Sequence, residues 1–478
     1  MGVIKNSIFI LTARGIQIVS SSFIVIAIAR YLSVEMYGDY AYVIALVSAV
    51  MALTYFGIQQ VTIREIAKDR ANAHLYIGSA IVLRGGLAAI AAVTMLVSML
   101  FIKPSNLMSA GIAVAIVSES FLTFGMLFRA VFQAFEKMLY EPLITIIYCI
   151  ALSAGIAVVI YFDMGFLWLL IVTAAANAVQ CAAAAFIVSY RFVRPSFMVD
   201  KKIFKALLVH SSVIGLGIFF YQNLFRIDVL MLKWLGSAKE VALFQVPHNM
   251  VMQVEILPAA LMAALFPVLS RLMKSDPDRV VDVYEKSFRY IFILSLILSI
   301  YLCLFSKEII GIVFGSKYSQ SAASFVVVSW AVVPLSMDIL LNAVLIVMNK
   351  QKYSVYYGGI TLAVNFLAAL VLIPAYGFMA AAYIALFSYC LLFLFSMYFV
   401  AKAGLPVVLD RILSKTVLAG AIGAAGMIWL KQFSIIIALS FGVTAYFGVL
   451  LMTGAFPPDV FPAFKAAIKN FTGTKHDR

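Results

Sequence analysis

Apolar stretches long enough to cross a lipid bilayer recur along the whole chain. One crossing needs about 20 mostly apolar residues, and backbone inside lipid satisfies its own hydrogen bonds by forming a helix. The composition fits a chain built mainly from such stretches, since 64% of the 478 residues are hydrophobic and 12% are charged. The sequence therefore predicts an all-α polytopic membrane protein. About fourteen spans are expected, at approximately 8–29, 40–60, 75–100, 107–128, 142–162, 165–189, 208–232, 242–267, 289–305, 322–348, 355–374, 378–400, 416–430 and 434–454.

Basic residues concentrate in alternate loops between these spans. If the N-terminus is inside, 25 of the 35 Lys and Arg residues lie in cytoplasmic segments and 7 lie in outer segments. Cytoplasmic loops collect Lys and Arg, so we expect both termini on the cytoplasmic side. This bias also explains the net charge of +14 without a nucleic-acid partner. Ala27–Ala29 before Arg30 resembles a signal-peptidase site, but the apolar stretch that starts ahead of Arg14 favours a retained span.

Two short stretches, each at the end of one span and the start of the next, resemble each other. Ala29–Tyr40 and Leu232–Phe244 each carry a basic residue, an aromatic residue, a leucine, an acidic residue and a further aromatic. They lie six spans apart, so the two halves have the same orientation, which indicates a parallel repeat. We expect six-helix lobes at 1–200 and 201–404. An extra transmembrane pair and an amphipathic tail with a cytoplasmic location, centred on 460–471, should occupy 405–478.

Charged and polar side chains inside the spans are the candidate site residues, because a charge in lipid is costly and usually faces a cavity or a partner. Arg14 and Gln17 share one face of the first span, and Arg226 shares a face of the seventh span with residues one turn earlier. Spans 1 and 7 are repeat partners, so these faces are predicted to meet across a cavity. Arginine suits a diphosphate because its planar fork donates two parallel hydrogen bonds. The predicted substrate-binding residues are Arg14, Gln17, Arg84, Gln222, Asn223 and Arg226.

Other interpretations of these charges stay open. Arg84 could pair with Glu119 rather than contact substrate, and Arg14 and Arg226 could extend to the membrane surface. Glu119, Glu255 and Asp338 fall near the middle of spans 4, 8 and 10 and are candidates for ion coupling. The sequence contains no nucleotide-binding loop, no HExxH and no GxSxG motif, and its cysteines are isolated. We therefore predict no catalytic residue, metal or cofactor, and an energy source that is an ion gradient, membrane potential or downhill substrate flux.

Turn and helix-end residues in three parts of the chain follow an order that is specific to one group of transporters. The stretches are Arg30–Tyr40, Arg226–Ser270 and Asn349–Ala382, with Tyr37-Gly38-Asp39-Tyr40, Phe266-Pro267-Val268-Leu269-Ser270 and Ile373-Pro374-Ala375-Tyr376-Gly377 among them. Through them the chain resembles the O-antigen-type polysaccharide flippases of the MOP exporter superfamily. The resemblance covers spans 1–12 and transfers no catalytic residue.

The resemblance implies two six-helix lobes around a central cavity that opens alternately to each side of the bacterial inner membrane. It implies a substrate of undecaprenyl diphosphate carrying an oligosaccharide, which moves from the cytoplasmic to the outer leaflet for synthesis of a surface polysaccharide such as lipopolysaccharide. Membrane lipids, a polysaccharide polymerase and chain-length proteins are the implied partners. The sugar and the oligomeric state stay open.

Two other functions compete with this expectation. A cation-coupled multidrug exporter of the same superfamily typically has twelve spans and an acidic site, whereas this sequence has fourteen candidate spans and an arginine in the first. A membrane-embedded polymerase or acyltransferase would need a substantial outer loop and a catalytic cluster, and the sequence shows neither. We therefore expect a transporter rather than an enzyme.

Overall fold

The computed structural model describes residues 2–196, 200–254, 256–408 and 411–455, and regular structure within these ranges is entirely helical. This confirms the all-α class. The helices are α1 (Gly2–Tyr31), α2 (Val34–Tyr55), α3 (Ile58–Lys68), α4 (Ala73–Ile102), α5 (Asn106–Ala134), α6 (Tyr140–Tyr161), α7 (Phe166–Arg191), α8 (Lys201–Leu235), α9 (Ala238–Val254), α10 (Ile256–Ser275), α11 (Pro277–Leu304), α12 (Ser306–Val313), η1 (Ser316–Tyr318), α13 (Ser321–Ser329), α14 (Val332–Val347), α15 (Lys352–Lys402), α16 (Arg411–Leu430) and α17 (Ile435–Met452).

Polar residues between the apolar stretches start the helices. Ser33 accepts a hydrogen bond from the Met36 amide at the start of α2, and Asp200 accepts from Lys202 and Ile203 at the start of α8. Asp276 precedes Pro277 and caps α11. Such caps satisfy backbone amides that have no partner inside the helix, so each helix begins at a defined residue.

The protein is a multi-pass membrane protein. Within the described residues, ten helices are long and apolar enough to cross a membrane, and the bent pair α13–α14 raises this number to eleven. One of the ten, α15, consists of two helical parts that meet at Gly377, where the backbone leaves the helical region (φ 55°, ψ −137°). The sequence predicts two spans there. The number fourteen stays a prediction.

The predicted second span contains a break that its apolar composition does not reveal. The helix α2 ends at Tyr55, Phe56 and Gly57 take positive φ values of 27° and 65°, and α3 continues from Ile58. The helix α12 and the turn η1 occupy the predicted outer segment 306–321. The predicted amphipathic tail at 460–471 lies outside the described residues.

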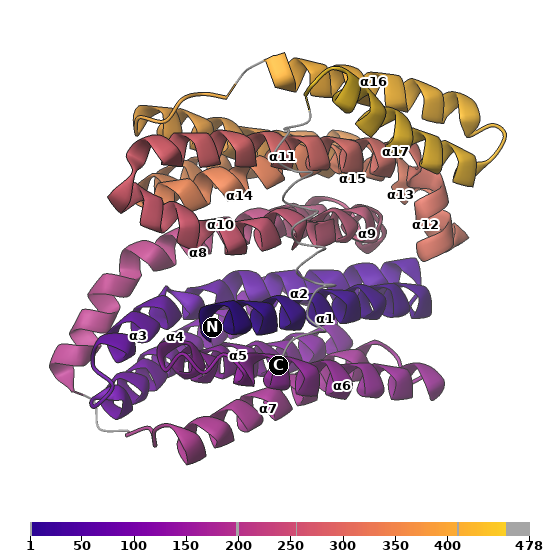
Figure 1. The fold of residues 1–478 in the computed structure, drawn as a ribbon. Helices are drawn as coiled ribbons and strands as arrows, with labels where there is room; N and C mark the ends of the chain where they lie inside the picture. The colour runs from indigo at the N-terminus through magenta and orange to yellow at the C-terminus, as the bar shows by residue number, and fades with distance from the viewer. Residues whose placement is uncertain (1, 197–199, 255, 409–410, 456–478) are drawn as a thin grey trace, which may run out of the picture.

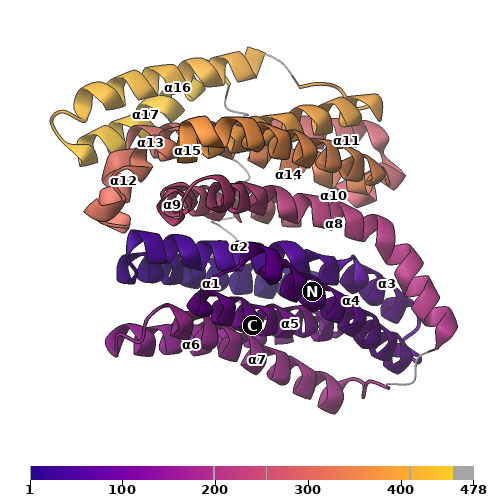
Figure 2. The same cartoon turned by 180° about the vertical axis from the view of Figure 1, so that it is seen from behind.

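The helices form two packed groups. The helices α1–α7, here called the first lobe, lie in the lower half of Figure 1, and α8–α15, the second lobe, lie above them, with α16 and α17 on the far side of α11. Figure 2 shows the same two groups from behind. Across the boundary between the groups, α2 contacts α8 and α9. The domain limits at 200 and 404 stay predictions.

Two glycines bring the lobes into backbone contact at both ends of α2. A Cβ atom on Gly38 would lie 1.8 Å from the Ala238 carbonyl oxygen of α9. A Cβ atom on Gly215 of α8 would lie 2.7 Å from the Phe56 backbone. Since α2 has 22 residues, these contacts are about 30 Å apart along the helix, roughly the thickness of a bilayer core.

Candidate functional site

A cavity of about 340 Å³ lies between the two lobes. Its size is at the lower end of small-molecule sites, so a lipid-linked oligosaccharide would fit only if the lobes separated at one end. Four helices supply its wall, α1 and α2 from the first lobe and α8 and α9 from the second. The described lining residues are Ile24, Val25, Ile28, Tyr37, Tyr40, Ala41, Ile44, Ala45, Ser48, Phe225, Arg226, Val229, Gln245, His248, Asn249 and Met252.

Arg226 is the only side chain with a fixed charge on the described wall of this cavity. Its Nε donates to Ser48 Oγ at 2.6 Å, and its Nη1 donates to the Gln222 carbonyl at 2.7 Å. Ser48 belongs to α2 and Gln222 to α8, so the guanidinium joins the two lobes. Both acceptors are neutral, and a diphosphate could replace them with charge-assisted hydrogen bonds.

A buried carboxylate lies near this guanidinium in the first lobe. Glu119 of α5 is hydrogen-bonded to the Tyr55 hydroxyl at the end of α2 and attracts the charge of Arg226. Its Oε2 is buried without a partner. Buried polar atoms nearly always have partners, so this oxygen can accept a further hydrogen bond. Arg226, Glu119 and Tyr55 therefore form a polar cluster at the lobe boundary.

Arg84 does not join this cluster as an ion pair with Glu119. It is fully buried and donates from Nη1 to the Thr123 carbonyl of α5, while its Nε and Nη2 have no partner. Among the described residues Arg84 forms no ion pair with Glu119, although Thr123 lies one turn after Glu119. Substrate contact by Arg84 stays a prediction.

The other predicted substrate residues lie at separate places. Gln17 has an exposed side chain and does not line the cavity, and the side chain of Arg14 lies outside the described residues. Gln222 lines a second cavity of about 400 Å³ between α8, α14 and α15. Asn223 donates to the Ala49 carbonyl at 3.3 Å across the lobe boundary. The structure therefore brings Asn223 and Arg226 of α8 together with α2, while Gln17 of α1 does not line this cavity.

Of the remaining candidate carboxylates for ion coupling, Asp338 does not line the inter-lobe cavity. Asp338 is buried in the second lobe beside Ser396, with Oδ1 unpartnered. Glu255 lies outside the described residues. Asp228 is buried next to Asn365, which in turn donates to Ser388 at 3.0 Å. No group of three or more His, Cys, Asp or Glu side chains in the described part of the chain could hold a metal ion.

Sequence reasoning missed the polar residues of α9 that line the cavity. Gln245 Nε2 donates to Asn249 Oδ1 at 2.7 Å, and Asn249 Nδ2 donates to the Tyr37 hydroxyl of α2 at 3.2 Å. His248 is hydrogen-bonded through Nε2 to the Tyr389 hydroxyl at 2.6 Å. The spacing of Gln245 and Asn249, one helical turn apart, is a signal in the sequence that marks this face.

Charged residues also fasten the lobes at the end of the molecule that carries the α1–α2 turn, the predicted outer end. Arg30 donates to the Val313 carbonyl at 2.8 Å, and Lys317 donates to the Leu32 carbonyl at 2.6 Å. Lys233 pairs with Asp39 at 2.6 Å. We call Arg30, Asp39, Lys233 and Lys317 the outer clasp.

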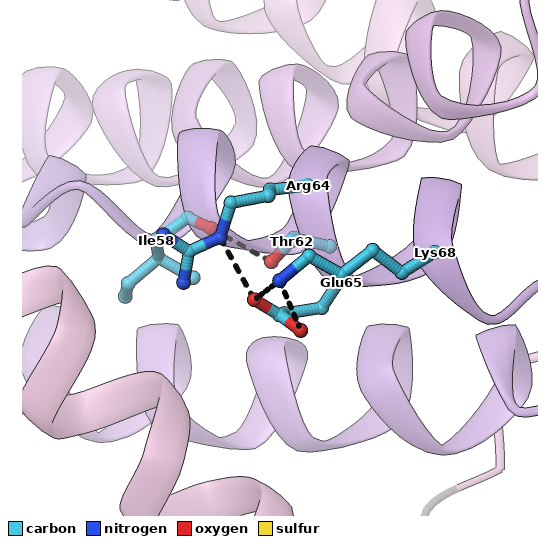
Figure 3. A network of polar contacts seen from close by, with 5 residues as sticks. All are labelled: Ile58, Thr62, Arg64, Glu65 and Lys68. Atoms are coloured by element: carbon cyan, nitrogen blue, oxygen red, sulfur yellow. Dashed lines mark hydrogen bonds and ion pairs between the residues drawn. The ribbon is translucent and has the colours of Figure 1, made fainter.

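The opposite end of the first lobe carries a charged helix face. On α3, Arg64 and Lys68 both reach Glu65, at 2.8 Å and 3.2 Å, and Thr62 bonds back to the Ile58 carbonyl (Figure 3). The other face of α3 is buried. This division places α3 at a boundary between packed helices and a polar environment, as a predicted cytoplasmic segment requires.

The sequence model of a family described as polysaccharide biosynthesis protein matches residues 3–273, more than half of the chain. The chain belongs to this polysaccharide biosynthesis protein family. An uncharacterized membrane protein of Methanocaldococcus jannaschii is 24% identical over 193 residues. That match spans 40% of this chain and 38% of the relative, well under two thirds of its length.

Solved structures of transporters share the fold of this family member. A lipid II flippase, MurJ, in an inward closed conformation has a TM-score of 0.76 at 13% identity, covering 96% of this chain and 100% of that one. A mutant of the Vibrio cholerae MATE transporter VcmN has a TM-score of 0.62 at 14% identity, covering 84% and 96%. A MOP superfamily transporter from Pyrococcus furiosus has a TM-score of 0.61 at 14% identity with the same coverage. The chain therefore has a MOP superfamily transporter fold.

Proposed function

We propose that this protein is a flippase for lipid-linked oligosaccharides. It moves undecaprenyl-diphosphate-linked repeat units from the cytoplasmic to the outer leaflet of the bacterial inner membrane, for synthesis of a surface polysaccharide such as the O-antigen of lipopolysaccharide. The observation that carries the proposal is the inter-lobe cavity with Arg226 as the only fixed charge on its described wall. Membership of the polysaccharide biosynthesis protein family and the shared fold with a lipid II flippase support it.

The geometry suggests how the headgroup is held. A diphosphate that enters the cavity would replace Ser48 and the Gln222 carbonyl as acceptors for Arg226. Because the Ser48 contact joins the lobes, taking Arg226 from it also weakens the boundary. Substrate binding and lobe separation are thereby coupled at one side chain, and this coupling is what alternating access requires.

Opening then alternates between the two ends of α2. Separation at the Gly215–Phe56 contact admits the headgroup from the cytoplasmic side, and separation at Gly38–Ala238 and the outer clasp releases it. The lipid tail stays in the bilayer throughout. We propose that both termini are cytoplasmic. We also propose that Glu119, Glu255 or Asp338 supplies ion coupling. Of Glu119 and Asp338, whose side chains are described, Glu119 is the one whose charge acts on Arg226.

Among the other predicted contacts, we retain Arg14 and Gln17 as headgroup contacts of a conformation in which α1 turns toward the cavity. The polymerase and chain-length proteins are proposed as partners that receive the flipped unit. The family and the cavity together support the proposal of transport rather than catalysis.

A cation-coupled multidrug exporter is the second candidate, favoured by the buried carboxylate of Glu119 and by the fold shared with MATE transporters. A cationic drug would need that carboxylate on the cavity wall. The described wall instead carries Arg226, which repels a cation.

Deletion of the gene tests the proposal. We expect lipid-linked repeat units to accumulate on the cytoplasmic leaflet and one surface polysaccharide to disappear, with drug sensitivity unchanged. Broad drug sensitivity with an intact surface polymer would establish the exporter instead.

A further inference from the structure

The inter-lobe cavity has two chemically different ends. Arg226 and Ser48 form one end, and Tyr37 with the amides of α9 forms the other. Tyr37 and Ser48 are both on α2, and their separation in sequence corresponds to about 16 Å along the helix. A ligand that spans the cavity therefore meets a cation at one end and neutral polar groups at the other.

The neutral end is a hydrogen-bonded row contributed by both lobes. Gln245 donates to Asn249, and Asn249 donates to Tyr37. The amides and the phenol offer donors and acceptors without charge, as the hydroxyl groups of an uncharged sugar require.

Two polar atoms in this row have no partner. Gln245 Oε1 and His248 Nδ1 are buried without a hydrogen bond, and His248 is 2% exposed. A buried polar atom that lacks a partner costs about 1–3 kcal/mol. Two such atoms on one cavity wall are explained if a ligand supplies the missing partners when the cavity is occupied. Nδ1 can donate or accept according to its tautomer, as a sugar hydroxyl can.

Aromatic rings surround the row. Tyr37 and Tyr40 stack at 6.4 Å between ring centroids, and Phe225 stacks on Tyr389 at 5.6 Å. His248 lies between Phe244 and Tyr389, nearly parallel to both. Of these rings, Tyr37, Tyr40, Phe225 and His248 line the cavity. Sugar rings present C–H groups on their faces and hydroxyls at their edges, so these lining rings and the amides beside them match both surfaces.

We propose that Tyr37, Gln245, His248 and Asn249 form a saccharide subsite that binds the sugars next to the diphosphate, and that these sugars are uncharged. The inference rests on the proposed function, because it requires that Arg226 binds the diphosphate while the row binds the sugar. An acidic sugar would bury a carboxylate among groups that carry no positive charge, which is costly.

Binding of defined lipids to the purified full-length protein tests this subsite. The probes are undecaprenyl diphosphate, undecaprenyl diphosphate N-acetylglucosamine and undecaprenyl diphosphate glucuronic acid, measured by native mass spectrometry in detergent micelles. We expect the neutral sugar to increase affinity at least tenfold over the bare diphosphate and the acidic sugar to give no increase. The double variant Gln245→Leu, Asn249→Leu should bind the bare diphosphate like the wild type and lose the tenfold gain.

A matched control is available in the first lobe. Gln180 donates to Asn177 at 2.7 Å in α7, a buried amide pair outside the cavity. Gln180→Leu should keep the tenfold gain. If the double variant does not fold, Gln245→Ala replaces it. This variant leaves the Asn249–Tyr37 hydrogen bond in place, and we expect the neutral sugar to increase its affinity only about threefold.

The possible results separate the two proposals. Equal loss of affinity for all three lipids, a retained sugar gain in the double variant, or an equal gain from glucuronic acid would overturn the subsite while leaving the flippase proposal intact. A wild-type protein that binds none of the three lipids would contradict the flippase proposal, and the subsite with it.

Discussion

The side-chain amine of Lys317 donates to the backbone carbonyl of Arg30 at 2.8 Å, while the guanidinium of Arg30 donates to Val313 in the opposite direction. Arg30 lies at the end of α1 and Val313 at the end of α12. Each lobe thus supplies a cation to the C-terminal carbonyls of a helix in the other lobe, where backbone acceptors lack partners and the helix dipole favours positive charge. The outer clasp is therefore a mutual helix cap between the lobes.

The clasp should control access from the predicted outer side. Lys317→Ala removes two hydrogen bonds between the lobes, and a loss of about 1.4 kcal/mol would shift the open population about tenfold. We expect a cysteine introduced by Ala41→Cys on the cavity wall to react several times faster with an impermeant thiol reagent added outside. The four native cysteines are replaced in every variant used for this labelling. Lys239→Ala, which removes an exposed lysine near the same end, should leave the rate unchanged, and an equal increase there would contradict the clasp.

The two glycines should act on opposite ends of the cavity. Gly38→Val places atoms where the Ala238 carbonyl lies, and Gly215→Val does the same at Phe56. We expect Gly38→Val to increase outside labelling of Ala41→Cys and Gly215→Val to increase labelling from the cytoplasmic side only. Gly311→Ala in α12 meets no atom within 4 Å and serves as the control. The same direction of change in both variants would show that these contacts do not gate separate ends.

Arg84 should tolerate an apolar replacement of similar length. Its charge is buried with one hydrogen bond to a carbonyl and two unpartnered nitrogens, and such buried charges are often replaced without loss of stability. We expect Arg84→Met to keep wild-type melting temperature and surface polysaccharide. Adding Glu119→Ala to Arg84→Ala should not restore stability, since the two side chains form no ion pair. Stable protein with lost transport in Arg84→Met would show that Arg84 reaches the substrate in another conformation.

Periodicity was sufficient to predict the helical class, while the parallel repeat that relates spans 1 and 2 to spans 7 and 8 stays a prediction. Apolar composition alone could not locate the break at Phe56 and Gly57, because the break depends on the positive φ values of these two residues. It could not separate Arg226 from Arg84 either. Both are arginines inside apolar helices, and only packing decides that one lines the cavity and the other is enclosed by α5.

The amide row of α9 leaves only a weak signal in the sequence. Gln245 and Asn249 are spaced one turn apart, yet neutral amides in a span carry a smaller energetic signal than charges. Their partner Tyr37 lies more than 200 positions earlier in the chain, a distance that no local pattern connects. The contacts of Arg30 and Lys317 in the outer clasp are equally hard to predict, since their acceptors are backbone carbonyls and do not depend on residue type.

Acid should loosen the attachment of α16 and α17 to the second lobe. Glu308 of α12 accepts from Lys431, which follows α16, at 2.9 Å, and Lys431 also donates to the Leu304 carbonyl. Burial raises the pKa of Glu308, but the hydrogen bond and charge of Lys431 outweigh it, so the pKa is lowered overall. Because the pKa of Glu308 is lowered, its ionised carboxylate stabilises the attachment at pH values above the ordinary carboxyl pKa near 4.3. This stabilisation is lost as the pH falls through the pKa of Glu308 in the folded protein.

The attachment is measured by electron paramagnetic resonance distances between nitroxide labels on cysteines placed on α12 and on the turn after α16. We expect the distance distribution to broaden as pH drops below about 4 in the wild type and to be broad at every pH in Glu308→Gln. Glu35→Gln changes a carboxylate at the start of α2 and should leave the pH dependence unchanged. A pH-independent wild type would refute the role of this pair.

Arg226 should act on both substrate and lobe closure, and variants of its two partners separate these effects. Arg226→Lys keeps the charge and loses the planar fork, so we expect partial surface polysaccharide at normal protein level, and Arg226→Ala should lose most of it. Ser48→Ala removes only the acceptor in the first lobe. The guanidinium is then free for a diphosphate, so undecaprenyl diphosphate should bind severalfold more tightly while the closed state becomes less populated. Weaker binding in Ser48→Ala, or full transport in Arg226→Ala, would contradict a guanidinium that is shared between the lobe boundary and the headgroup.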